Sequence, residues 1–217
     1  KLLSAVFFFV KRNAMTVVVS ISCSDGSVIL GGDSFCGDSE VSDLCFEDKV
    51  YTVGPVGVGI CGSVRNEQVL KKALCHYVLE KKEVTEEWIR GDLSEEIREY
   101  MKEAGCVGET NGYQEIKDSG FILSFNGKNF FLDDDFGMWE SKRSFCAIGA
   151  GRHYAYGALS ALVLSHYPDL SSRPEPSIAA EFVFKSLQIA SVWSPWVSAP
   201  FSLVSVPPVM IPDEVEE

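Results

Sequence analysis

Two apolar runs joined by a short turn limit the folds open to this chain more than any other feature. The first run reads TVVVSIS from Thr16, the second reads VILGGD to Asp33, and CSDGS lies between them. Asp25-Gly26 is typical of a tight hairpin turn, and β-branched side chains favour strands. Residues 28–30 are apolar without the alternation of a half-exposed strand, so we expect this strand to be covered on both faces. The hairpin is therefore predicted to lie at the centre of a layered protein.

The composition allows one large core and argues against several classes of partner. The 217 residues are 46% hydrophobic and no interior Pro/Gly/Ser-rich linker divides them, so we expect one domain. The formal net charge is -12, and no cluster of Lys and Arg offers a phosphate-binding surface, so nucleic acid is not expected as a partner. Seven cysteines without a C-x-x-C pair indicate neither a disulfide framework nor a zinc site. Reduced thiols in a cytoplasm fit this pattern.

Residues 1–14, KLLSAVFFFVKRNA, precede the hairpin and form a separate N-terminal segment. Their apolar run is too short to span a bilayer, so no membrane partner is expected. Lys11 and Arg12 occupy the place where a signal peptide has small neutral residues before its cleavage site. Three interpretations stay open: a propeptide, an extension in front of a true start at Met15, or a genuine N-terminal element. The third would keep the nitrogen of Thr16 in a peptide bond.

After the hairpin, the periodicity alternates between strands and helices. Strands are expected at 49–53, 56–60, in GFILSF, NFFLDDDF and SFCAIGAG, and at 201–206. Amphipathic helices are expected around 69–78 and 88–101, over 153–167 and from 176 to 190, while the polar stretches 36–48 and 106–117 are expected as loops. This order suits helices packed outside a pair of stacked sheets.

Thr16 is the candidate nucleophile because it directly follows a methionine. Removal of Met15 would leave one residue with both a hydroxyl and a free α-amine that can act as its base. Asp33 at the end of the second strand, Lys49 at the start of the next and Gly62 in the Gly-rich strand end GVGICGSV are candidates to complete such a site. No metal or other cofactor is expected, since His153 and His166 are too far apart on one helix to share an ion.

From Thr16 to about Val206 the chain resembles a proteasome β-type subunit, nearest to the HslV-like threonine peptidases of bacteria and their phage-borne relatives. The residues that carry this resemblance are TVVVSI with VILGGDS, KVYTVG, GICGSVRNEQVL, AIGAGRHYAYGAL and AAEFVFKSLQIA, in the family's order. The resemblance implies an α+β fold, the four-layer αββα sandwich of two stacked, mainly antiparallel sheets known as the Ntn-hydrolase fold. The chain then divides into an N-terminal extension or propeptide (1–14), an Ntn-hydrolase domain (15–207) and an acidic tail (208–217).

The same resemblance implies threonine-dependent hydrolysis of polypeptides inside a self-compartmentalised, homo-oligomeric ring in the cytoplasm, with an AAA+ ATPase unfoldase as a partner. Thr16 would attack the scissile carbonyl, Lys49 would favour the developing alkoxide, and Asp33 would keep Lys49 charged. The backbone N–H of Gly62 would stabilise the oxyanion. Ile60 and Val64 would form an apolar wall of the substrate pocket.

The chain departs from the family pattern at two places. Ala150 stands where active relatives usually have a serine that hydrogen-bonds the nucleophile's amine. Near SVWSPWVS no Asp occupies the place of a supporting acid, and Ser194 or Ser198 are the candidates to replace it. Two alternatives therefore stay open: a catalytically silent ring or scaffold protein with the same fold, and, less favoured, an Ntn amidohydrolase that acts on a small amide.

Overall fold

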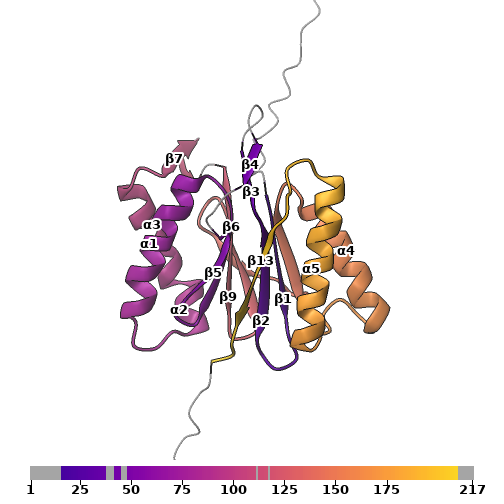
Figure 1. Ribbon diagram of the computed structural model, residues 1–217. Coiled ribbons are helices and arrows are strands. Elements are labelled where there is room, and N and C mark those ends of the chain that lie inside the picture. The colour runs from indigo at the N-terminus through magenta and orange to yellow at the C-terminus, as the bar shows by residue number, and fades with distance from the viewer. Residues whose placement is uncertain (1–15, 38–41, 45–47, 111, 117, 210–217) are drawn as a thin grey trace, which may run out of the picture.

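Two β-sheets lie face to face between two layers of helices in the computed structural model of this chain (Figure 1). The structure describes residues 16–37, 42–44, 48–110, 112–116 and 118–209. Paired strands within each sheet are antiparallel. The predicted α+β fold with four layers is thereby confirmed.

The first sheet contains the hairpin that the sequence places at the centre. Its strand order is β12-β1-β2-β13, with β12 at Phe145–Gly149, β1 at Val17–Ser22, β2 at Val28–Asp33 and β13 at Phe201–Val206. Val17 and Val19 of β1 pack toward the helices, whereas Val18 packs toward the second sheet. The unbroken apolar run thus reflects a strand that is buried on both faces.

The second sheet faces the first and carries the other predicted strands. Its order is β11-β10-β9-β6-β5, with β11 at Met138–Glu140, β10 at Lys128–Leu132, β9 at Ser119–Phe125, β6 at Val56–Gly62 and β5 at Val50–Val53. Leu30, Val50 and Ile122 belong to the apolar layer between the two sheets. Gly57 and Gly59 of β6 let the first sheet come close. A Cβ on Gly57 would lie 2.3 Å from the side chain of Val206, and a Cβ on Gly59 would lie 2.6 Å from that of Val18.

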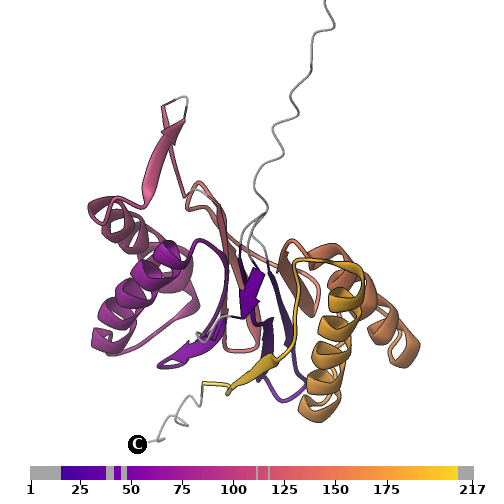
Figure 2. The same ribbon diagram turned by 45° about the horizontal axis from the view of Figure 1, so that its top comes forward.

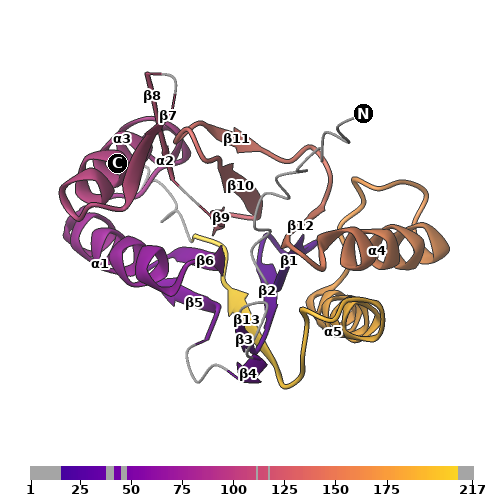
Figure 3. The same cartoon turned by 90° about the horizontal axis from the view of Figure 1, so that it is seen from above.

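Helices cover the outer face of each sheet, as the view from above shows (Figure 3). α4 (Arg152–His166) and α5 (Pro176–Trp193) pack on the first sheet. α1 (Val64–Glu80), α2 (Glu86–Arg90) and α3 (Asp92–Glu103) pack on the second. Within the described ranges, no helix combines the length and apolar character needed to cross a membrane.

Three local predictions were wrong. The expected helix around 88–101 is divided at Gly91 into α2 and α3, where the backbone leaves helical geometry (φ -106, ψ -87). The polar stretch 106–117 contains a hairpin of β7 (Val107–Thr110) and β8 (Tyr113–Ile116), which stands clear of the sheets in Figure 2. The stretch 36–48 contributes to a second small hairpin, β3 (Phe35–Gly37) and β4 (Ser42–Leu44). Neither small hairpin belongs to a large sheet, and their polar sequences lack the apolar periodicity that marks the other strands.

Candidate functional site

The candidate site lies at one end of the sandwich, where three chain segments meet. Thr16 immediately precedes β1, Asp33 is the last residue of β2, and Lys49 immediately precedes β5 of the opposite sheet. The β1–β2 hairpin places the start of one strand beside the end of the other, with Val18 opposite Gly32. A Cβ on Gly32 would lie 3.3 Å from the Cβ of Lys49, so glycine here permits the close approach of the lysine.

The hydroxyl of Thr16 lies between a cation and a carboxylate. The ammonium of Lys49 donates to Thr16 Oγ1 at 2.5 Å and to Asp33 Oδ1 at 3.0 Å. Thr16 Oγ1 in turn donates to Asp33 Oδ1, and a further Lys49 N–H donates to the carbonyl of Phe35. The sequence-predicted Thr16, Asp33 and Lys49 are therefore brought together in one hydrogen-bonded group.

This group is almost completely withdrawn from solvent. Thr16 is 1% exposed, Asp33 3% and Lys49 9%. A buried charge is tolerated when it is paired and hydrogen-bonded. Both ions here meet that condition through each other and through main-chain groups, so the local fold can hold them in a fixed geometry.

Main-chain N–H groups orient the carboxylate of Asp33. Oδ1 accepts from the N–H of Val17 at 3.0 Å, while Oδ2 accepts from those of Phe35 at 3.1 Å and Ser198 at 3.2 Å. Sequence reasoning could not find these donors, because a backbone N–H has no residue-type signature. Ser198 thus contacts the site through its main chain, whereas the Ser194 hydroxyl accepts from Trp196 N at 3.4 Å within a local turn.

The segment that joins β12 to α4 holds the main chain of Thr16. The N–H of Gly151 donates to the Thr16 carbonyl at 3.1 Å. Gly149 adopts φ +90, and a Cβ there would lie 2.3 Å from the same carbonyl oxygen, so this approach requires glycine. Ala150 lies between these two glycines and offers only a methyl group. The guanidinium of Arg152, a residue that sequence reasoning missed, donates to the Gly149 carbonyl at 3.1 Å.

The end of β6 lies close to the candidate site, and the charges there act on the thiol of Cys61. Burial raises the pKa of the Cys61 thiol to about 12, and the charges of Lys49 and Arg152 act against this rise. Cys61 is therefore a neutral thiol at physiological pH rather than a second nucleophile. Gly62 follows it at φ +116, where a Cβ would overlap the Asp118 carbonyl. That backbone conformation explains why position 62 is a glycine. The role of the Gly62 N–H as an oxyanion donor stays a prediction.

The two residues predicted for a pocket wall lie in different surroundings. Ile60 is 1% exposed and packs in the apolar core between the second sheet and α1. Val64, the first residue of α1, is 40% exposed. Of the pair, only Val64 offers surface to a ligand in this structure, and the pocket assignment stays a prediction.

The chemistry open to this arrangement depends on the nitrogen of Thr16. The chain still carries residues 1–15 before Thr16, so that nitrogen is part of a peptide bond here. A hydroxyl held by an ammonium at its oxygen is prepared for attack on a carbonyl, since the cation favours the alkoxide form. If residues 1–15 were removed, the free amine would stand on the residue that carries this hydroxyl.

Solved structures with the same architecture are subunits of proteasome-like proteins. BPH from Thiobacillus denitrificans, solved in complex with epoxomicin, superposes with a TM-score of 0.67 at 17% identity, over 89% of this chain and 100% of that one. HslV from Trypanosoma brucei gives 0.62 at 18% identity, over 88% and 98%. Anbu from Yersinia bercovieri, an ancestral β-subunit, gives 0.63 at 15% identity, over 88% and 82%.

The fold is that of the proteasome-like subunits. The coverage extends over nearly all of this chain and most or all of each neighbour, so the likeness concerns the whole four-layer sandwich. No family model and no curated protein matched the sequence in the same comparisons. At identities of 15–18%, the proteasome-like fold is what these likenesses establish.

Proposed function

We propose that this protein is a threonine peptidase whose nucleophile is Thr16 after removal of residues 1–15. The observation that carries the proposal is the contact of Thr16 Oγ1 with both Lys49 Nζ and Asp33 Oδ1 inside a buried group. A structural threonine at the start of a strand needs neither a buried lysine nor a carboxylate at its hydroxyl. The pair makes sense as a device that activates this oxygen.

The reaction follows from these positions. The released α-amine of Thr16, with a reference pKa of roughly 7.7–8.0, accepts the hydroxyl proton, directly or through water. Oγ1 then adds to the scissile carbonyl, the C–N bond breaks, and the departing amine takes the proton. Water subsequently hydrolyses the ester and regenerates the threonine. Lys49 stabilises negative charge on Oγ1, Asp33 holds Lys49 in place, and the N–H of Gly62 supports the oxyanion.

We further propose that the subunit works in a closed ring on polypeptides, as its proteasome-like fold suggests. Large apolar side chains are exposed on the outer helices, with Val192 74% and Trp193 65% exposed on α5. Contiguous exposed apolar surface is typical of protein interfaces. A cytoplasmic location and an AAA+ ATPase unfoldase that feeds the ring stay predictions, and native mass spectrometry of the purified protein would give the ring size.

A catalytically silent ring or scaffold protein is the second candidate, and Ala150 favours it. A methyl group at this position cannot accept a hydrogen bond from the amine of a mature Thr16, so the base would be held by fewer partners. An Ntn amidohydrolase acting on a small amide would use the same nucleophile with a different pocket. A panel of peptides and small amides separates these two enzymes.

The decisive experiment combines an intact mass with a hydrolysis assay. We expect a mass that begins at Thr16 and hydrolysis of a fluorogenic peptide that epoxomicin, the ligand of the BPH structure, inhibits. Thr16→Ala should abolish this activity. A purified protein that retains residues 1–15 and hydrolyses no peptide would refute the peptidase and support the scaffold.

A further inference from the structure

A cavity of about 740 Å³ lies at the end of the sandwich away from Thr16. It is bordered by the β5–β6 turn, the end of α1, the segment leading into α2 and the β9–β10 turn. Because β13 is antiparallel to β2, with Val206 opposite Val28, the end of β13 also reaches this side. The volume is within the range of roughly 300–1,000 Å³ typical of ligand sites. The cavity takes no part in the chemistry proposed for Thr16.

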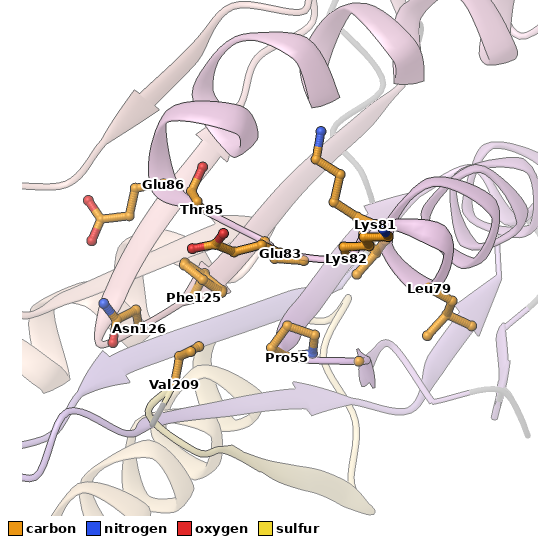
Figure 4. Close-up of a pocket in the computed structure, with 13 residues that line it drawn as sticks. Pro55, Leu79, Lys81, Lys82, Glu83, Thr85, Glu86, Phe125, Asn126 and Val209 are labelled. Carbon is orange, nitrogen blue, oxygen red and sulfur yellow. The ribbon is translucent and has the colours of Figure 1, made fainter. Parts of the chain in front are cut away.

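The walls of the cavity combine buried apolar side chains with lysines. Val78 and Phe125 line it but are only 2% and 3% exposed, so the exposed Leu79 offers most of the apolar surface that a ligand could reach. Lys81 and Lys82 line the same cavity (Figure 4). Glu83 and Glu86 line it as well, so apolar side chains are what these walls offer a ligand.

The chain itself leads into this cavity after β13. Pro207 and Pro208 follow the strand, and Val209 both lines the cavity and packs on the core beneath it (Figure 4). Proline fixes φ near -65°, so the two prolines restrict the direction in which the chain continues. The residues after Val209 therefore start from a point inside the site.

The sequence after Val209 begins with apolar side chains that such walls can bind. Residues 210–217 read MIPDEVEE, two apolar residues and a proline followed by four carboxylates among five residues. Eight extended residues reach at most about 26–29 Å, which is ample to cross the cavity. Two lysines and two glutamates line it. Glu86 is paired with Lys128 at 2.5 Å, and the ammonium of Lys81 lies 4.8 Å from the centre of the Trp88 ring, so Lys82 is the lysine that this rim offers to an acidic residue.

We propose that residues 210–217 of this chain occupy this cavity. Met210 and Ile211 cover the apolar wall around Leu79, and the acidic residues 213–217 continue past Lys82. The cavity is thus a binding site for a short peptide with an apolar start and an acidic end, filled by the chain's own tail. This site is independent of whether Thr16 is catalytic.

The test measures binding of the tail as a separate peptide. A fluorescent peptide of residues 210–217, acetylated and amidated to exclude terminal charges, is titrated by anisotropy into the full chain and into a variant that ends at Val209. We expect the shortened variant to bind the peptide at least tenfold more tightly, because in the full chain the tethered tail competes at roughly millimolar effective concentration. A full-length Met210→Asp, Ile211→Asp variant should bind the peptide as tightly as the shortened one. It replaces the shortened variant if truncation impairs folding.

Site variants locate the binding. In the shortened chain, Leu79→Asp and Lys82→Glu should each weaken peptide binding at least fivefold, whereas Lys72→Glu, an exposed lysine of α1 outside the cavity, should leave it unchanged. Equal affinity for full and shortened chains, or no binding to either, would overturn the proposal. A change of oligomeric state on truncation would also overturn it, since the tail would then fill the cavity of a second copy.

Discussion

Two buried polar clusters lie along the same face of β1, and they differ in charge. At the start of the strand, Thr16 meets the ion pair of Asp33 and Lys49. Farther along, Ser20 and Ser22 meet a neutral group from the other sheet. Positions 16, 20 and 22 share one face because side chains alternate along a strand.

The neutral cluster joins the two sheets through the side-chain amide of Asn129. Its Oδ1 accepts from Ser20 at 2.5 Å and from Ser124 at 2.8 Å, and its Nδ2 donates to Ser22 at 3.1 Å. Each of these four residues is at most 2% exposed. The cluster holds no charge and no hydroxyl activated by an ion, so its contribution is to the pairing of the sheets. The two clusters share burial and hydrogen bonding, so the ion pair is the feature that makes Thr16 the candidate nucleophile.

The largest expected effect is on the charged cluster. Lys49→Met leaves the buried carboxylate of Asp33 without its cation, and this should lower the free energy of unfolding by about 3–5 kcal/mol and abolish peptide hydrolysis. Urea unfolding and the fluorogenic assay measure the two losses. Lys128→Met, which breaks the partly exposed pair with Glu86, is the matched control and should change stability by about 1 kcal/mol or less. Similar losses in both variants would contradict the distinction between the two pairs.

A substitution in the neutral cluster should lower the free energy of unfolding but leave the rate of hydrolysis unchanged. Asn129→Leu keeps the approximate volume of the side chain and leaves three buried hydroxyls with fewer partners, at an expected cost of about 1–3 kcal/mol. The rate constant for hydrolysis by the folded protein should stay within twofold of the original. A large fall in kcat with unchanged stability would show that the cluster belongs to the catalytic machinery.

A third prediction uses the thiol beside the charged cluster. The pKa of Cys61 is raised from 9.0 to about 12 in the folded chain, so the unfolded chain loses this proton first as the pH rises. Its contribution to stability is fully present below pH 9 and is lost between pH 9 and about 12. Cys61→Ala removes this titrating thiol. The free energy of unfolding should then fall less steeply between pH 9 and about 12, by at most about 1.4 kcal/mol per pH unit. Urea unfolding of both proteins from pH 8 to 10.5 measures the difference, and parallel curves would contradict it.

The smallest expected change in stability is at Ala150, beside the charged cluster. Ala150→Ser adds one hydroxyl at a partly buried position and should change the free energy of unfolding by about 0.5 kcal/mol or less. If the mature Thr16 amine lacks a partner, the same hydroxyl should raise kcat several-fold. Ala147→Ser, on the preceding strand β12, is the control and should leave kcat unchanged. No gain in the Ala150 variant would mean that the amine is held by other groups.

The sequence by itself predicted the layers and three candidate site residues that the structure brings together. The unbroken apolar runs of the hairpin required strands covered on both faces, and the placement of Thr16, Asp33 and Lys49 at strand ends brought them to one edge. The hairpins β3–β4 and β7–β8 escaped prediction because they lack the apolar alternation of a strand packed on a core.

Only the tertiary structure decided how those residues meet and which others join them. Asp33 accepts hydrogen bonds from the main-chain N–H groups of Phe35 and Ser198, and Lys49 donates to the carbonyl of Phe35. Main-chain groups have no residue-type signature, so the sequence could not predict these contacts. The same is true of Ile60, whose burial in the core depends on helices that pack from elsewhere in the chain. Periodicity encodes which face of an element is buried, whereas contacts between distant segments arise only when the layers pack.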